Sequence, residues 1–154
     1  MRRRVIGLVD VLIGAVAKKV REAFGDEIEV YTESVYQNAH KPCFFVQCES
    51  SERIEMLNKN FFVRVHVAVT YENDSDEKRR AAESVTATLF DALSHIRVED
   101  VCFNGRRIHG KWENGSMVIR AIYDMWTEIS DEEHELMETI EVKEIYDGAG
   151  VYEG

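Results

Sequence analysis

Residues 60–71 alternate between two kinds of side chain more clearly than any other part of the chain. One set forms an apolar row: Phe61, Val63, Val65, Val67, Val69 and Tyr71. The residues between them are of mixed character: Phe62, Arg64, His66, Ala68 and Thr70. Because the side chains of a β-strand point alternately to its two faces, this period of two predicts a long strand with one face over a hydrophobic core.

Two amphipathic helices are predicted to cover that core. Apolar residues recur every three or four positions over about residues 4–24 and again over about residues 75–95, which is the spacing of a single helical face. Gly25, directly after the first segment, is a common helix end. Residues 73–76, Asn-Asp-Ser-Asp, supply N-cap candidates for the second helix. We expect both helices to pack on the same face of the sheet.

Two further strands are predicted before the long one. Ile28 and Val30 alternate with glutamates, which is the period of a short strand. The only proline of the chain, Pro42, has no N–H to donate, so it is tolerated at the first residue of a strand but not inside a central strand. A strand is therefore expected to begin there and to cover residues 43–49. Residues 50–59 are expected to form a polar connection.

A β-hairpin is predicted later in the chain. Asn114-Gly115 lies between two strand-like runs, at about residues 107–113 and 116–127, and this dipeptide is the strongest short-range hairpin signal. In the second run, apolar residues alternate with a mixed set, as they do in the long strand.

The predicted fold class is α+β. We expect a largely antiparallel β-sheet with two helices packed on one face and a β-hairpin. A last short element is expected at about residues 136–146. The chain is thus predicted to be a single domain over residues 1–146, followed by a mobile C-terminal tail over residues 147–154.

Charge and cysteine content restrict the classes of function. The formal net charge is −10, and affinity for nucleic acid comes largely from Lys and Arg, so we expect no tight grip on DNA. Three cysteines, an odd number, favour reduced thiols in a cytosolic protein over a disulfide framework. The apolar run at residues 5–17 contains Asp10 and is too short to span a bilayer, so no membrane partner is expected.

No motif points to catalysis, a cofactor or a metal. Cys43 and Cys48 would lie on opposite faces of one strand, which favours packing over metal binding. The five histidines form no ligand pair, and His66 could act as a general base only beside a carboxylate. The acidic run at residues 131–135 lacks the pattern of a calcium loop. Nucleotide-binding loops and nucleophile elbows are absent from the sequence. We predict no catalytic, cofactor-binding or metal-binding residue.

The mixed face of the predicted sheet is the main candidate for a functional surface. It combines large apolar residues with charged ones: Phe62, Arg64, His66, Val118, Arg120, Ile122, Asp124 and Trp126. Left uncovered, such a surface would be more apolar than a monomer usually tolerates, which favours a subunit interface. Alternatively, the hairpin or the C-terminal segment folds over it. Both interpretations stay open at this point.

The order of these elements resembles the small tail terminator proteins of long-tailed bacteriophages and of phage-like particles of Gram-positive bacteria. The resemblance covers roughly residues 5–137. It includes the N-terminal helix, the segment VYQNAHKPCFFVQC, the strand FFVRVHVAVTY, the helix ending in LFDALSHI and the hairpin RRIHGKWENGSMVIRAIYDMW. The family likewise shows a Gln, a polar turn, a Pro and an aromatic-rich strand, and later a polar strand, a tight turn and an apolar strand ending in Tyr-Asp. The chain departs from the family in its longer segment after Met137.

The resemblance implies a structural protein that caps the tail tube as a ring, typically a hexamer. Such a ring ends tube polymerisation and forms the joint to the head connector or neck. The implied partners are further copies of the chain, the tail tube protein, the head connector or neck protein and, in a contractile tail, the sheath protein, with DNA only as cargo in the lumen. The implied location is the tail-neck junction of a virion or phage-like particle, assembled in the bacterial cytoplasm. Contacts are also expected from the loop before Pro42: Gln37, Asn38, His40 and Lys41.

Two alternatives come from other classes of function. The chain could be a different neck component, such as a head-tail adaptor. It could also be a small α+β enzyme or ligand-binding domain with a site around Arg64, His66 and Asp124. A ring should elute at several times 17.8 kDa, whereas a monomeric or dimeric enzyme should not.

Overall fold

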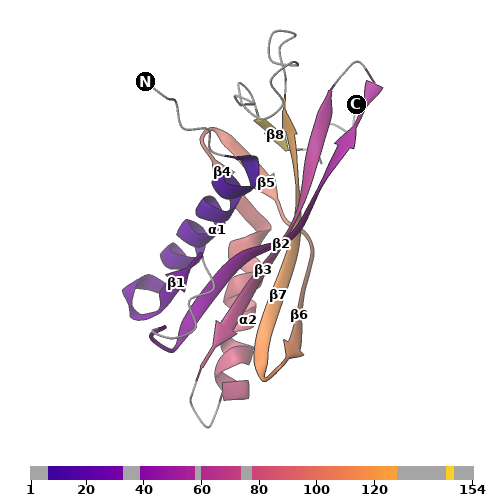
Figure 1. Cartoon of the computed structure of the whole chain (residues 1–154). Coiled ribbons are helices and arrows are strands. Elements are labelled where there is room, and N and C mark those ends of the chain that lie inside the picture. Colours follow the sequence, from indigo (N-terminus) through magenta and orange to yellow (C-terminus); the bar gives the residue numbers. More distant parts are fainter. Residues whose placement is uncertain (1–6, 33–38, 58–59, 74–77, 128–144, 148–154) are drawn as a thin grey trace.

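The computed structural model describes residues 7–32, 39–57, 60–73, 78–127 and 145–147. Within these residues, two α-helices form one layer and a six-stranded β-sheet forms the other (Figure 1). The predicted α+β class is confirmed, including the placement of both helices on one face of a mostly antiparallel sheet.

The large sheet is built around the strand that the alternating pattern predicted. Its central strand, β3, is flanked by β2 on one side and β7 on the other, and the order across the sheet is β1-β2-β3-β7-β6. The short strand β8 also pairs with β7. β1 and β2 pair in parallel, and the other neighbours are antiparallel. The bounds are β1 Glu29–Tyr31, β2 Cys43–Glu55, β3 Phe61–Glu72, β6 Arg106–Glu113, β7 Ser116–Thr127 and β8 Ile145–Asp147.

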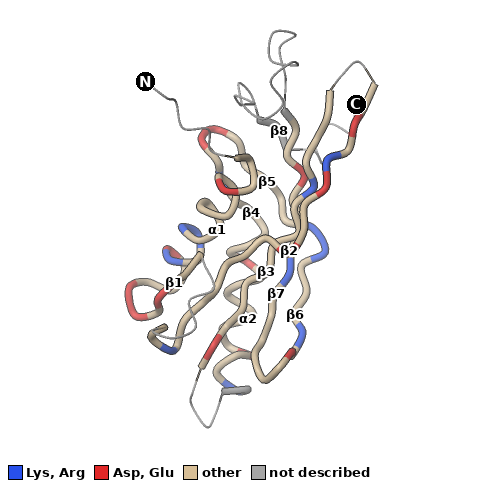
Figure 2. The backbone as a smooth tube through the Cα atoms, in the orientation of Figure 1, with Lys and Arg blue, Asp and Glu red and all other residues tan. Residues whose placement is uncertain are grey.

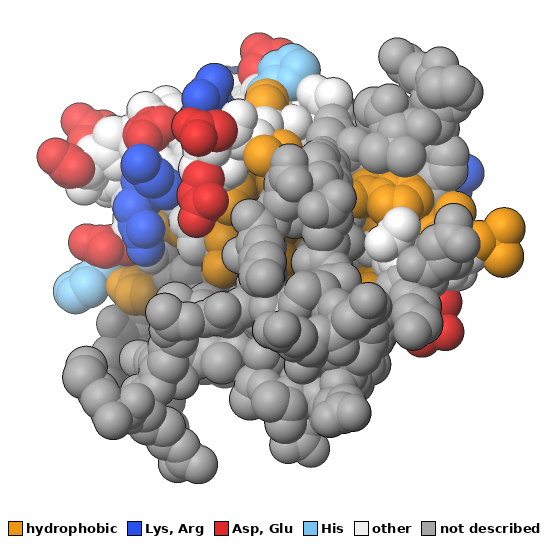
Figure 3. Space-filling view, turned by 90° about the horizontal axis from the view of Figure 1, so that it is seen from above, with side chains coloured by type: hydrophobic (Ala, Val, Ile, Leu, Met, Phe, Trp, Pro, Cys, Tyr) orange, Lys and Arg blue, Asp and Glu red, His pale blue; other side chains and the backbone are white. Residues whose placement is uncertain are grey.

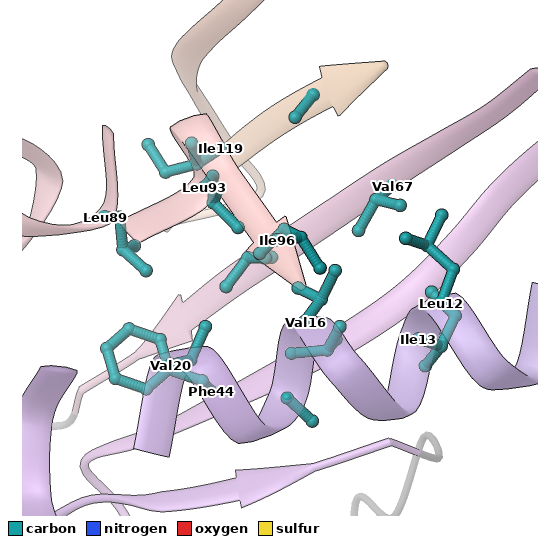
Figure 4. Packing of buried hydrophobic residues seen from close by; sticks show 14 of the residues in the cluster. Leu12, Ile13, Val16, Val20, Phe44, Val67, Leu89, Leu93, Ile96 and Ile119 are labelled. Atoms are coloured by element: carbon teal, nitrogen blue, oxygen red, sulfur yellow. The ribbon is translucent and has the colours of Figure 1, made fainter. Parts of the chain in front are cut away.

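The core lies between the sheet and the helices α1 (Leu8–Phe24) and α2 (Lys78–Ser94). Most of the apolar row of β3 faces these helices, and Val65 and Val69 of that row have no exposed surface. Figure 4 shows how side chains from both helices interlock with those of the sheet. The labelled residues are Leu12, Ile13, Val16, Val20, Phe44, Val67, Leu89, Leu93, Ile96 and Ile119. The helix periodicity and the strand alternation therefore identified the two sides of a single core.

Two local signals in the sequence are also confirmed. α1 ends at Gly25, which has a φ of 74° and donates its N–H to the carbonyl of Arg21. A short 3-10 helix, η1 (Gly25–Glu27), follows and leads into β1. Asn114 and Gly115 both have positive φ, 52° and 82°, as the two-residue turn between β6 and β7 requires.

The prediction of a polar connection over residues 50–59 is wrong for most of that range. β2 continues to Glu55 and pairs with the first half of β3. The register shifts between Cys48 and Ser50, so the alternation restarts and is hidden from a simple period of two. This half of the β2–β3 hairpin extends past the helical layer as an arm (Figure 1). Because no helix covers residues 50–53 there, they are exposed and polar.

The sequence also missed a two-stranded sheet between α2 and β6. It consists of β4 (His95–Val98) and β5 (Val101–Asn104). Ile96, which fits the apolar spacing of α2, belongs to β4 and is fully buried. Gly105 then passes so close to the end of α2 that a Cβ would lie 2.3 Å from the carbonyl oxygen of Leu93, so only glycine fits there.

The predicted last element is described only at its end. β8 begins at Ile145 and pairs with the end of β7, with Trp126 opposite Tyr146. The remainder of the predicted range 136–146, the tail residues after 147 and the first residues of the predicted N-terminal helix lie outside the described residues.

Candidate assembly surface

The face of the sheet opposite the helices, called the outer face below, brings the predicted surface residues into neighbouring pairs. β3 and β7 run antiparallel, so each mixed-row residue of one strand lies opposite a mixed-row residue of the other. The pairs are Phe62 with Trp126, Arg64 with Asp124, His66 with Ile122, Ala68 with Arg120 and Thr70 with Val118. The register therefore collects the candidate residues of two distant sequence segments in one patch.

The aromatic pair of the outer face is covered within a single chain. The rings of Phe62 and Trp126 stack with their centroids 4.7 Å apart, and the two residues are 2% and 8% exposed. Val118 is buried as well, at 7%. The interface hypothesis assumed open apolar surface at these positions, and that surface is absent. Only the small exposed parts of these side chains can contact another subunit, and such a contact remains a proposal.

Asp124 forms the centre of an ion-pair cluster next to the aromatic pair. Its carboxylate is fully buried and accepts bonds from Arg64, with Nε–Oδ1 at 2.8 Å and Nη2–Oδ2 at 3.1 Å. Arg106, at the start of β6, donates to the same Oδ2. A buried carboxylate is tolerated when cations and hydrogen bonds compensate its lost hydration. The cluster thus ties β3, β7 and β6 together.

This cluster removes the carboxylate that an enzyme site around His66 would need. The Asp124 oxygens are bound by guanidinium groups, and the described residues show no bond from Asp124 to the His66 ring. His66 itself is half-buried opposite Ile122. The arrangement is suited to holding strands together rather than to proton transfer.

Arg120 makes a second cluster further along the outer face. Its guanidinium binds Glu49 of β2, at 2.6 and 3.1 Å, and Glu113 of β6, at 2.9 and 2.7 Å. These hydrogen bonds, first that to Glu49 and then that to Glu113, raise the pKa of Arg120 further above its ordinary value. The bond from Arg120 lowers the pKa of Glu113. Arg120 thus bridges strands that are not neighbours.

Three members of these clusters were not predicted: Glu49, Arg106 and Glu113. Glu49 reaches Arg120 from the place where the register of β2 shifts, and no period-two pattern identifies such a residue. Arg106 and Glu113 lie at the two ends of β6. The hairpin signal located β6, and charge pairing across the hairpin could have suggested Glu113 as a partner of Arg120.

The loop before β2 is described only at its end. His40 and Lys41 are exposed, and the backbone N–H of His40 donates to the Tyr31 hydroxyl at 3.1 Å. Gln37 and Asn38 lie outside the described residues. The structure therefore places two of the four loop residues at the surface beside β1.

The cysteines occupy three different environments. Cys43 is fully buried, Cys48 is half-buried against the core and Cys102 is exposed, and all three are free thiols. Burial raises the pKa of Cys48. Packing, predicted for the first two, describes them correctly. Among the described residues, no group of three His, Cys, Asp or Glu side chains could hold a metal ion.

A shallow groove of about 520 Å³ lies between α1 and the β4–β5 sheet. Charges of both signs line it: Lys18, Lys19 and Arg97 beside Glu22 and Glu99, with His95 and Cys102 among them. Seen from the end of the molecule, charged side chains of both signs gather on the helical side, whereas hydrophobic side chains show on the side of the hairpin arm (Figure 3). The groove is open and does not adjoin either ion-pair cluster of the outer face.

The fold is an α+β domain in which two ion-pair clusters, around Asp124 and Arg120, join strands of the large sheet across its outer face. The comparison with protein families assigns this domain to a family. The family model described as "Phage tail terminator protein" matches residues 12–135, which is most of the chain. The chain belongs to the phage tail terminator family.

Membership identifies the chain as a phage tail structural protein and a component of the virion. The family is one of structural proteins rather than of enzymes, and its members interact with other tail and neck proteins. A search of the curated proteins found no match. None of the helices in the described part of the chain is long and apolar enough to cross a membrane.

Proposed function

We propose that this protein caps the completed tail tube as a homo-oligomeric ring, a hexamer. The ring ends polymerisation of the tube protein and forms the joint to the head connector or neck. The observation that carries the proposal is the match to the tail terminator family over residues 12–135. DNA passes through the lumen as cargo, and a net charge of −10 per chain favours a channel that does not hold it.

Two features of the described residues support an assembly role. The ion-pair clusters around Asp124 and Arg120 join strands across the outer face, which gives the subunit a stiff sheet. The hairpin arm ends in exposed apolar side chains, with Met56 at 41% and Leu57 at 87% exposure. Exposed apolar residues at the end of an arm favour a contact with another protein.

The test is tail length. Deleting the gene in its phage or phage-like particle should give tubes of uncontrolled length that fail to join heads, and the wild-type gene supplied in trans should restore uniform tails. Electron microscopy of the lysate measures both. Tails of normal length that lack heads would favour the alternative, a head-tail adaptor, because that protein acts after the tube has been completed.

Negative-stain microscopy of the purified protein tests the ring itself. We expect closed rings, alone or on the end of purified tubes. Protein that remains monomeric in both preparations would contradict the proposed assembly.

A further inference from the structure

We propose that neighbouring subunits of the ring meet through the two opposite edges of the large sheet, with the basic edge strand β6 of one copy against the acidic η1–β1 edge of the next. This inference rests on the proposed ring and names the two surfaces that close it. The partner is a second copy of this chain.

The two edges carry opposite charge. On β6 the exposed residues are Arg107, His109, Gly110 and Lys111. On the other side of the sheet, Asp26, Glu27 and Glu29 are exposed. Figure 2 shows the basic residues along β6 and the acidic residues at η1 and β1, on opposite sides of the fold.

The basic residues of β6 are only partly balanced by carboxylates inside the described part of the chain: Lys111 and His109 lie near enough to Glu113 to help lower the pKa of its carboxyl. Arg107 and Lys111 form no ion pair among the described residues, whereas Glu113, at the end of the strand, is held by Arg120. Arg107 has a φ of 53° at the register shift between Arg106 and His109. On the acidic side, the nearby cations Arg21 and Lys41 offset part of the charge of the three carboxylates: Arg21 donates to the neutral carbonyl of Val30 and keeps its own charge, and Lys41 is engaged within the chain.

The register places the two edges at the same level. One row of paired residues crosses the whole sheet, and its members are Tyr31, Phe45, Thr70, Val118 and Lys111. If successive subunits are related by rotation about an axis along the strands, the two ends of this row meet. Lys111 of one copy then lies level with Tyr31 of the next.

Glu29 is the acidic residue that this arrangement brings nearest to Lys111. It lies two residues before Tyr31 on β1, so both point to the same face of the sheet. The pairing of Glu29 with Cys43, and of His109 with Arg120 across β7, assigns Glu29, His109 and Lys111 to the outer face. A long lysine side chain can span the remaining offset along the edge.

Apolar side chains flank both charged edges. Thr86 of α2 lies 3.9 Å from the position of a Cβ on Gly110 of β6, and Phe90, one helical turn later on the same face, is 36% exposed. On the acidic side, Ile28 and Tyr31 are half-buried. Each edge can therefore supply apolar contact beside its charges.

Opposite edges meeting head to tail form a heterologous contact, which closes into a ring when the rotation between subunits permits. We expect side-chain contacts rather than one continuous sheet, because β1 spans only Glu29–Tyr31 and its Val30 carbonyl already accepts a bond from Arg21. Charge complementarity would also fix the direction of the ring, because two basic edges or two acidic edges repel each other.

Charge reversal tests the contact on the full-length protein. The variant Arg107→Glu/Lys111→Glu makes the basic edge acidic, and Glu27→Lys/Glu29→Lys makes the acidic edge basic. Each should raise the concentration at which half of the protein is assembled by about tenfold or more, since like charges then face each other. The combination of all four substitutions should restore assembly to within about threefold of wild type. Lys18→Glu/Arg97→Glu, on α1 and β4, makes the same change of charge away from both edges and should assemble normally.

Light scattering measures assembly, and thermal melting followed by circular dichroism checks that every variant is folded. Edge reversals that assemble like wild type would overturn the proposal. So would a fourfold variant that is folded but assembles no better than the single-edge reversals. Wild-type protein that never assembles, in solution or on tubes, would instead overturn the ring and the proposed function with it.

Cross-linking gives an independent readout that does not depend on charge. Lys111→Cys combined with Glu29→Cys, in a Cys102→Ser background that removes the exposed native thiol, should form covalent ladders from dimer to complete ring with a bifunctional maleimide reagent. A direct disulfide is not expected, because Glu29 lies two residues out of level with Lys111 and a disulfide requires Cα atoms within about 7 Å. Either cysteine alone should stop at a dimer or remain a monomer. Intact rings that give no ladder would overturn the edge contact and leave the ring standing.

Discussion

The two faces of the large sheet are both well packed, but they are built from different chemistry. On the helical face, β3 presents an aliphatic row that interlocks with α1 and α2. On the outer face, the sheet instead presents a stacked aromatic pair and clusters of guanidinium and carboxylate groups. Val65 and Arg64 are sequence neighbours with these opposite roles. Stability on the helical face comes from apolar burial, which does not depend on direction. On the outer face it comes from specific pairs of side chains, so replacing one member leaves its partner unsatisfied.

The largest expected effect breaks the helical face. Val65→Asp places a carboxylate at a position of β3 with no exposed surface, inside a cluster of buried apolar residues from the sheet and both helices. An unpaired buried charge costs several kcal/mol, which is of the order of the stability of a whole domain. We expect loss of the folded state, seen as a flat melting curve by circular dichroism. Val65→Ala, which leaves only a small cavity, should still fold.

The next effect concerns the aromatic pair of the outer face. Trp126→Ala should lower the free energy of unfolding by about 4 kcal/mol, because it removes a buried indole and its stack on Phe62. If Trp126 and Phe62 were open interface residues, a charged residue at either position would damage assembly more than folding. Their burial within one chain now predicts damage to folding as well. Leu57→Ala, at 87% exposure, is the control and should change stability by less than about 0.5 kcal/mol. Urea unfolding of Trp126→Ala and Leu57→Ala measures both free energies of unfolding. Equal values for the two variants would contradict the buried packing of Trp126.

A smaller loss is expected from the cluster around Asp124. Asp124→Asn removes the buried negative charge and leaves Arg64 and Arg106 facing each other without it. We expect a loss of about 3 kcal/mol, moderated because both arginines are partly exposed and can regain water. Denaturant unfolding provides the measurement.

A combined variant tests whether apolar side chains can replace the charged cluster around Asp124. Replacing Arg64, Arg106 and Asp124 together by apolar residues of similar size should recover most of that loss, because no charge is then left without a partner. If the combined variant is no more stable than Asp124→Asn, the cluster stabilises the fold through the fit of its side chains rather than through charge compensation.

The contrast between the faces also explains which parts of the structure could be predicted. Regular alternation located β3, the regular three-and-four spacing located both helices, and Asn114-Gly115 located the β6–β7 turn. The first two signals repeat along the chain, so a single exception does not hide them, and the turn needs only one dipeptide whose two residues accept positive φ. The exposed half of β2 was missed because the register shift at Glu49 interrupts its alternation and because the arm has no core to face.

The candidate surface was harder to predict than the fold. The period of two assigned Phe62, Arg64 and Trp126 to the outer face correctly, since face follows directly from alternation. It could not show that Phe62 and Trp126 are covered, because coverage depends on how distant segments meet. It also could not find Arg106 as a partner of Asp124, because they are 18 residues apart in sequence and their contact depends on a register shift inside β6.

The smallest expected effect sharpens the comparison on the outer face itself. Arg120 and its partners Glu49 and Glu113 are partly exposed, at 23%, 39% and 32% of their side chains, whereas Asp124 is fully buried. Water screens such pairs, so Arg120→Gln should lower the melting temperature by only about 2 °C. A loss as large as that of Asp124→Asn would mean that the two clusters act as one unit.

The pH dependence of this exposed cluster follows from the lowered pKa of Glu113. A carboxyl whose pKa is lower in the folded chain than in the unfolded chain stabilises the fold when ionised, so its contribution is present above its ordinary pKa of 4.5 and is lost as pH falls through the lowered folded value. Glu113→Gln should therefore be slightly less stable than wild type at about pH 7, and the difference should shrink and disappear as pH falls below the lowered folded pKa of Glu113, where its carboxyl is protonated. Melting curves of the two proteins at several pH values give the difference directly. A difference that does not change with pH would show that Glu113 holds Arg120 by shape and hydrogen bonding alone, and the two clusters of the outer face would then differ in the role of charge as well as in exposure.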